Sequence, residues 1–163
     1  MDPLALINMI RNLLILFCFC SCASLSKLDY EKEKKAILEL NAHSREYHFK
    51  KNALAMSDMS SDSFLVVNGG KISRPQREDQ LKTFTNYFNS VDFVRWDDLN
   101  EPIIRFSRDA SVAYVAVEKI VILKQLNTSN KEVLDTSYFA WISIYKKDRS
   151  GWKLDAIAST RKL

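Results

Sequence analysis

Hydrophobic residues recur at helical spacing in two stretches of the first half of this chain. The first stretch begins near Asp29, which suits an N-cap, and continues to about Lys51. A short helical piece over 53–59 follows it, and the second stretch runs from Pro75, a residue suited to a first helical turn, to Ser90. Along the first stretch the apolar positions step by three and seven residues, which places on one face Ile37, Leu40, Tyr47 and Leu54.

Strand patterns make up most of the remaining domain. A strand over 63–67 ends at Asn68-Gly69-Gly70, a turn sequence that suits positive φ angles. The two longest strands carry apolar residues on both faces, as expected of a curved antiparallel sheet with helices on one side and a partner subunit on the other. Helices followed by such a sheet predict an α+β fold, a cone of N-terminal helices packed in a strongly curved sheet. The strands expected after the second helix are 91–96, 102–107, 111–123, 136–147 and 152–159.

Composition and charge agree with a single packed domain. The chain has 163 residues, of which 47% are hydrophobic and 11% aromatic, and this suffices for a real core. The net charge of +4 is modest, and the densest basic patches, at 32–35 and 146–147, are interleaved with Glu31, Glu33 and Asp148. Such patches indicate solvated faces, so no nucleic-acid partner is expected.

The first 22 residues have the pattern of an export signal. Arg11 precedes an apolar run over 13–19, and small residues follow. This order is that of a cleavable secretory signal, and the run is too short to span a bilayer. The chain thus divides into a signal peptide over 1–22, a tether over 23–28 and a domain over 29–163. Both Met1 and Met9 are candidate start residues, because initiation at Met9 gives a more compact signal.

The predicted signal ends in Cys22. The residues before it resemble the lipobox of bacterial lipoproteins, although Phe19 stands where Leu is usual and Cys20 where Ala or Ser is usual. The resemblance implies an exported lipoprotein of the bacterial cell envelope, held at the membrane by a lipid anchor on Cys22. An ordinary cut after Ala23 would instead give a soluble periplasmic or secreted protein, and a retained anchor is the third alternative.

The predicted domain lacks the common signatures of metal and cofactor chemistry. All three cysteines lie inside the signal, so the domain has no disulfide, thiol nucleophile or cysteine metal site. Its two histidines are five residues apart on one helix and do not share a face, as metal ligands at i and i+4 would. With no phosphate-binding glycine loop and no GxSxG motif, neither a metal nor a cofactor is predicted.

Two segments of the chain resemble a known family. FSRDASVAYVAVEKIVI at 106–122 and FAWISIYKKDRSGWKLDAIAST at 139–160 are similar to strands of the nuclear-transport-factor-2-like superfamily. The resemblance is greatest to its SnoaL-like and domain-of-unknown-function branches of small bacterial proteins, and it covers about 29–163. It implies a cystatin-like cone whose sheet bends around the first helix to form a cavity, and a homodimer formed through the outer face of the sheet. Similar domains include isomerases, cyclases, dehydratases, ligand carriers and association domains, so the fold alone does not choose an activity.

Polar groups on the apolar strands are the candidates for chemistry. Glu118 stands mid-strand, where a buried carboxyl suits proton transfer; alternatively it pairs with Arg105 or faces solvent beside a dimer contact. Arg105 suits a carboxylate or phosphate at a cavity wall. Asp155 lies in the last strand, where similar proteins sometimes carry a polar group, and His43 beside Tyr47 is a candidate acid or base. Structural roles remain the alternative for each of these residues.

The chain also supplies a large aromatic surface, most of which must fill the core. If two of these side chains line an open cavity, they suit an apolar or ring-shaped ligand. The catalytic candidates, should the protein be an enzyme, are Glu118, Asp155 and His43. The predicted ligand-binding residues are Tyr47, Trp96, Arg105, Tyr114, Glu118 and Trp141.

Two functions from different classes follow. The first is a non-catalytic module, exported and lipid-anchored, whose cone binds a small apolar ligand or mediates dimerisation. The second is a cofactor-free SnoaL-like enzyme that performs isomerisation, cyclisation or dehydration by acid–base chemistry. It requires Glu118 and at least one further polar group to converge in one enclosed cavity. A third alternative, an immunity- or stress-related partner protein, would bind without a cavity.

Overall fold

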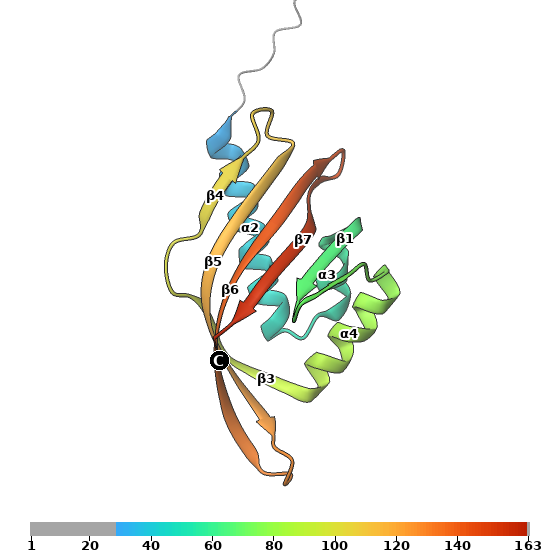
Figure 1. Ribbon diagram of the computed structural model, residues 1–163, viewed down its shortest axis with the longest axis vertical. Coiled ribbons are helices and arrows are strands. Elements are labelled where there is room, and N and C mark those ends of the chain that lie inside the picture. Colours follow the sequence, from blue (N-terminus) through green and yellow to red (C-terminus); the bar gives the residue numbers. More distant parts are fainter. Residues whose placement is uncertain (1–28, 163) are drawn as a thin grey trace, which may run out of the picture.

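The computed structural model describes residues 29–162 and has an α+β fold, as predicted. Two helices come first, two strands separate them from a further helix, and every element after that helix is a strand (Figure 1). In chain order the elements are α2 (Tyr30–Phe49), α3 (Ala53–Asp58), β1 (Ser60–Asn68), β2 (Lys71–Ser73), α4 (Arg77–Ser90), β3 (Val91–Asp98), β4 (Ile103–Phe106), β5 (Val112–Leu126), β6 (Glu132–Asp148) and β7 (Gly151–Arg161).

Local side-chain contacts determine where the helices begin. The Lys32 backbone N–H donates to the Asp29 carboxylate over 3.1 Å, which confirms the predicted N-cap of α2. Asn52 caps α3 in the same way through the Ala55 N–H. The prediction that Pro75 lies in the first turn of α4 is wrong. Gln76 is extended, with ψ of 162°, so the helix begins only at Arg77.

The strands form one curved sheet in the order β2-β1-β7-β6-β5-β3, and β4 pairs with the other end of β5. The pairing is antiparallel except between β1 and β7, which run parallel, so the sheet is mixed rather than wholly antiparallel. No hairpin joins these two strands in sequence, and their relative direction is therefore set by packing alone. The short strand β2, which the hydrophobic pattern did not indicate, pairs with β1 across the predicted glycine turn.

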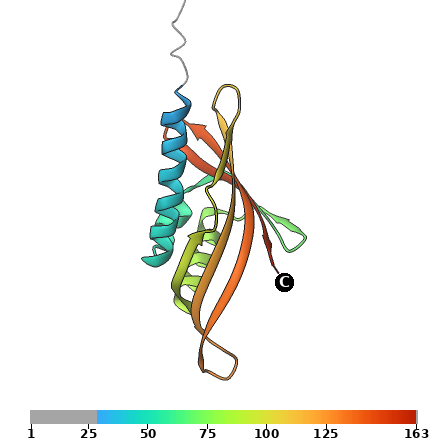
Figure 2. The ribbon, with the colours of Figure 1, turned by 90° about the vertical axis from the view of Figure 1, so that its left-hand side faces the viewer.

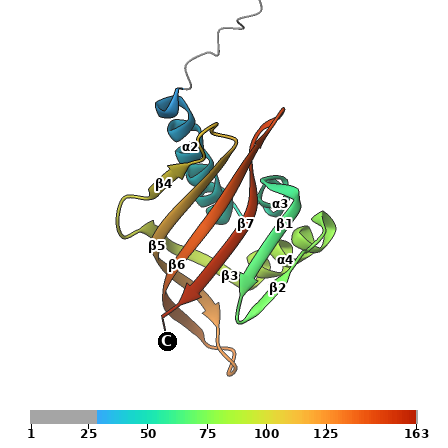
Figure 3. The same cartoon turned by 45° about the horizontal axis from the view of Figure 1, so that its top comes forward.

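The three helices of the described residues lie against the concave face of this sheet, and no described element covers the convex face (Figures 2 and 3). The main core packs Ile37 of α2 against Val115 and Val117 of β5 and Tyr145 of β6. A second cluster joins α3, α4 and β3 around Phe88. Among residues 29–162, no helix is long and apolar enough to cross a membrane.

Candidate functional site

A cavity of about 490 Å³ lies between the helices and the concave face of the sheet. Its walls come from α2, α3, α4 and the inner sides of the strands, so segments far apart in the sequence meet there. The volume is within the range of small-molecule sites in proteins. The lining is mainly apolar and aromatic, with polar groups grouped at the two ends and beside α2.

The deep end of the cavity is polar and closed to solvent. Tyr145 and Ser143, on the inner side of β6, are 3% and 5% exposed. The Tyr145 hydroxyl donates to Oδ1 of Asn41 on α2 over 3.1 Å, and burial raises the pKa of Tyr145 to about 12. Asn41 Nδ2 is also buried, yet it has no hydrogen-bond partner. This nitrogen has almost no accessible surface, so it does not face the open space of the cavity.

Aromatic side chains line the middle of the cavity close to His48, and they include Trp96, Phe139 and Trp141. The His48 ring stacks on Trp96 with centroids 3.9 Å apart, and Trp96 lies 5.9 Å from Trp141. His48 Nδ1 donates to the Ser44 carbonyl over 2.7 Å, which leaves Nε2 of the neutral ring as an acceptor. Burial lowers the pKa of His48 to about 4, although the bond to Ser44 acts in the opposite direction.

The opposite end of the cavity opens to solvent beside a loose ion pair. Arg161 Nη2 and Asp135 Oδ2 are 3.5 Å apart, and both side chains are substantially exposed. Tyr87 of α4 completes this end, and burial raises the pKa of its hydroxyl. The cavity thus runs from a buried neutral end, through aromatic walls, to a charged opening.

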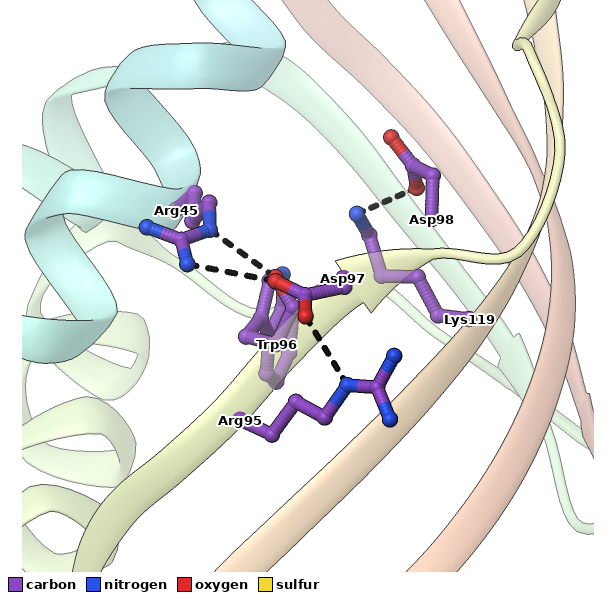
Figure 4. Close-up of polar contacts among 6 residues, drawn as sticks. All are labelled: Arg45, Arg95, Trp96, Asp97, Asp98 and Lys119. Carbon is purple, nitrogen blue, oxygen red and sulfur yellow. Dashed lines mark hydrogen bonds and ion pairs between the residues drawn. The ribbon is translucent and has the colours of Figure 1, made fainter.

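Ion pairs hold the aromatic wall in position (Figure 4). Arg45 of α2 donates through Nε to the Trp96 carbonyl over 3.0 Å and through Nη2 to Asp97 over 3.1 Å. Asp97 also accepts from Arg95 over 2.8 Å, and these hydrogen bonds from Arg95 and Arg45 lower the pKa of the Asp97 carboxyl. The contacts join α2 to β3 at the residue that carries the stacked indole.

A second ion pair supports Trp141. The Lys119 side chain is nearly buried and binds Asp98 (Figure 4). Its ammonium lies 5.7 Å from the centre of the Trp141 ring. Lys119 is paired with Asp98 and does not line the cavity. Within the described residues, no three His, Cys, Asp or Glu side chains gather to form a possible metal site.

Some of the residues predicted from the sequence to bind a ligand line the cavity, and the others do not. Trp96 and Trp141 line the cavity. Tyr47 instead packs beside the Phe88 cluster, and its ring stacks on the exposed His43 at 5.9 Å. Neither Tyr47 nor His43 lines the cavity.

The other strand candidates lie on the convex face. Arg105 and Tyr114 are paired neighbours on β4 and β5, and both are exposed. Glu118 is exposed too, and accepts a hydrogen bond from Asn100 over 2.9 Å. Arg105 donates to the Ile104 carbonyl rather than to Glu118. Of the three alternatives for Glu118, the structure therefore shows the solvent-facing one.

Asp155 lies at an irregularity in the pairing of β7 and does not line the main cavity. Its carboxylate accepts from the hydroxyls of Ser61 and Ser63, at 2.6 and 2.7 Å. Burial on its own would raise the pKa of Asp155, but these two hydrogen bonds hold it below the usual value. Its contacts join β1 to β7. Cys22, the predicted lipid-attachment residue, lies outside the described residues.

Sequence reasoning missed the residues that form the polar side of the cavity. It favoured His43, whereas the buried histidine is His48. A signal was present, because Ile37, Asn41, Ser44 and His48 follow one another at steps of four, three and four. A helical face that carries polar residues at such steps packs toward the interior only if buried polar groups form hydrogen bonds with them, as Tyr145 does with Asn41.

No protein-family model matches this chain, and no curated protein matches it in sequence. Solved structures do match it in shape. A candidate dehydratase of the NTF2-like family from Streptomyces avermitilis has a TM-score of 0.68 at 11% identity, covering 82% of this chain and 99% of that one.

Two further structures are similar over most of their length. An NTF2-like protein from Cytophaga hutchinsonii has a TM-score of 0.62 at 15% identity and covers 79% of this chain and 98% of its own. The association domain of CaMKII from C. elegans has a TM-score of 0.57 at 14% identity, covering 80% and 96%. Identities this low establish a common fold and leave the activity open.

Proposed function

The chain has the nuclear-transport-factor-2-like fold, and on this premise we propose that it is a non-catalytic module that binds a small apolar ligand in its cone. The observation that carries the proposal is the cavity itself. It is large enough for a small molecule, and an aromatic wall that includes Trp96 and Trp141 lines its middle.

Binding of a neutral apolar fluorophore, N-phenyl-1-naphthylamine, tests this proposal directly. Its emission should rise on binding to the purified protein, because the aromatic walls of the cavity exclude water. Ser137→Trp places a large ring inside the cavity and should abolish the rise. Thr136→Trp is the matched control, since the neighbouring residue on β6 is exposed and does not line the cavity. Equal binding by both variants would contradict a site in the cone.

A cofactor-free SnoaL-like enzyme is the second candidate. Its predicted acid–base groups Glu118, Asp155 and His43 are dispersed over three regions, and this dispersion supports a non-catalytic role. His48 is the one observation that favours an enzyme, because its Nε2 is an acceptor on a ring that lines the cavity. A pKa near 4 makes it a weak base.

We also propose that the convex face mediates a homodimer. Apolar side chains stand exposed there on three adjacent strands, by 38–54%: Ile103, Val112, Tyr114, Ile142 and Ile144. A patch of this kind is typical of an association surface. The similarity to an association domain is compatible with such a role.

Export and lipid attachment at Cys22 complete the proposal. The support is the order of charge, apolar run and small residues over 1–22. Intact mass spectrometry of protein from the membrane fraction should give a chain that starts at acylated Cys22. A chain that starts at Ser24 and is recovered from the soluble fraction would contradict the anchor.

A further inference from the structure

One half of the convex face carries long side chains. Tyr114 on β5 is paired with Arg105 on β4 and with Ile144 on β6, and paired residues point to the same face of a sheet. These three residues therefore form one row across the strands. All three are exposed, Tyr114 by 45%. The row projects from the sheet and has a positive charge at one end.

The other half of the convex face is hollowed. A groove of about 770 Å³ lies there, between the turn that joins β1 to β2 and the loop before β4; we call it the convex groove. Its lining includes three alanines of neighbouring strands, whose short side chains leave the space open: Ala116, Ala140 and Ala158. Among the described lining residues, the charged side chains are Glu101 and Glu118. The convex groove therefore combines small apolar side chains with negative charge.

We infer that the occupant of this face is a second copy of the chain, related by a two-fold axis that runs across the strands. In this arrangement Tyr114 enters the convex groove of the partner subunit, and Arg105 pairs with Glu118 of the partner subunit. The inference rests on the homodimer proposed above and specifies its contacts. It joins three observations: the projecting row, the convex groove, and the opposite charges of the two.

The positions of the row and the groove fit two-fold symmetry. Ala116, Ile142 and Ala158 are paired across β5, β6 and β7, which lie side by side, and they form a middle row (Figure 3). The row of Tyr114 lies two residues away on one side, and the row of Ala140 lies two residues away on the other. A two-fold axis between the two sheets, along the middle row, places the Tyr114 row of each copy over the Ala140 row of the other. Every contact is then made twice.

The charges at the two ends are too far apart to meet within one copy. Arg105 is level with Tyr114, and Glu118 lies four residues further along β5, which is about 13 Å. Arg105 donates to the carbonyl of Ile104, and Glu118 accepts from the neutral amide of Asn100, so neither forms an ion pair within the described residues. Burial of either charge in a contact without a counter-charge would be costly. The second copy supplies the counter-charge to both.

The sideways offset between the two charged residues is small. Arg105 stands on β4 and Glu118 on the neighbouring strand β5, and neighbouring strands are about 4.8 Å apart. Packed sheets are usually inclined to each other by about 30°, and this inclination compensates for most of the offset. The guanidinium of Arg105 then lies over the carboxylate of Glu118 of the partner subunit.

Charge reversal tests the pairing on the purified protein. Arg105→Glu introduces two like-charged pairs into the dimer, and Glu118→Arg does the same. Each variant alone should therefore associate at least about tenfold more weakly than the unmodified protein in sedimentation equilibrium. Lys82→Glu, at an exposed position on α4, is the matched control and should associate like the unmodified protein.

A mixture of the two reversed variants gives the sharpest measurement. In a mixed dimer each position 105 faces a position 118 of opposite charge, so both ion pairs form again with inverted polarity. Native mass spectrometry, with one variant labelled with ¹⁵N, should show the mixed dimer well above the share of about one half that random pairing gives. A share at or below one half would overturn the pairing of Arg105 with Glu118. Misfolded subunits could not produce the rescue, so a folding defect cannot imitate it.

The groove contact has a test of its own. Ala140→Phe places a ring in the convex groove, where the inference puts Tyr114, and should weaken the dimer. Tyr114→Ala in the same chain should restore part of the association, because the added ring then occupies the space of the missing one. No restoration would contradict the entry of Tyr114 into the groove.

The outcomes separate this inference from the proposed homodimer. A dimer of the unmodified protein that is insensitive to both charge reversals would leave the homodimer in place and overturn this arrangement. A monomeric unmodified protein would overturn both, and the convex face would then belong to a partner of different sequence.

Discussion

Glu33 joins the start of α2 to the end of the sheet. Its nearly buried carboxylate accepts from Lys147 Nζ over 2.6 Å and from Trp152 Nε1 over 2.7 Å. The hydrogen bond from Lys147 lowers the pKa of Glu33 most; burial opposes it, and Trp152 adds to the lowering. This single side chain therefore satisfies the buried indole N–H of Trp152 and pairs with the exposed ammonium of Lys147.

Glu33→Gln should destabilise the protein by about 1–3 kcal/mol at pH 7, because hydrogen bonds to a charged acceptor are lost. The stabilisation by Glu33 is present above the unfolded pKa of 4.5 and is lost as the pH falls through the lower folded value. Urea unfolding across pH measures both effects. Glu39→Gln, which breaks an exposed pair with Lys35, should cost almost nothing. Equal costs for the two variants would be inconsistent with this account.

His48 should give the stability a pH dependence in a higher range. Its folded pKa is about 4 and its unfolded value is 6.5, so between these values only the unfolded state gains the proton. Stability should fall by about 3 kcal/mol as the pH drops from 6.5 to 4, and then level off for this group. His48→Phe should flatten that part of the curve, whereas His43→Gln, exposed on the same helix, should leave it unchanged. Unfolding free energies of the unmodified protein and of both variants at pH 7, 5.5 and 4 test this expectation.

At the scale of elements, the turn between β1 and β2 shows where local sequence is sufficient. Gly69 and Gly70 have φ angles of +57° and +73°, as the dipeptides predicted. The hairpin of β5 and β6 shows where it is not. The strands run on to Leu126 and back from Glu132, beyond the predicted limits, through residues without a regular alternation of polar and apolar side chains. Backbone pairing extends them, for example between Gln125 and Val133.

Gly70→Val should destabilise the protein by about 1–2 kcal/mol through backbone strain, because a branched L-residue tolerates positive φ poorly. No other atom lies within 4 Å of a side chain added there, so crowding does not contribute. Gly70→Asn is the matched control and should cost less, since Asn accepts this conformation. Chemical denaturation of both variants measures the difference, and equal stabilities would contradict a strained turn.

At the scale of the whole molecule, the uncovered convex face should determine the oligomeric state. Ile142, 46% exposed near the middle of β6, lies in the apolar patch. Ile142→Lys should shift the protein toward the monomer in sedimentation equilibrium, because an ammonium would be buried unpaired in the contact. Leu54→Lys, on α3 and 52% exposed, is the control and should leave the association unchanged. A monomeric unmodified protein would refute the proposed dimer.

Local patterns in the sequence predict the class of fold and nearly every element. Helical period, capping residues and glycine turns depend on a few neighbouring residues, so they can be predicted from the sequence. The N-cap at Asp29 and the turn at Gly69 are examples. Even the two tryptophans of the cavity wall, Trp96 and Trp141, were found among the aromatic residues.

Which face of each element meets the cavity depends on the packing of the folded chain. Alternation along β5 separates two faces but does not say which one the helices cover, so Glu118 could be assigned to either side. Likewise, the choice between His43 and His48 depends on how α2 rotates against β3, which Arg45 and the Trp96 stack determine from residues about fifty positions away. Long-range packing determines these orientations. They depend on how much surface is buried over the folded chain as a whole, and no short stretch of sequence contains that information.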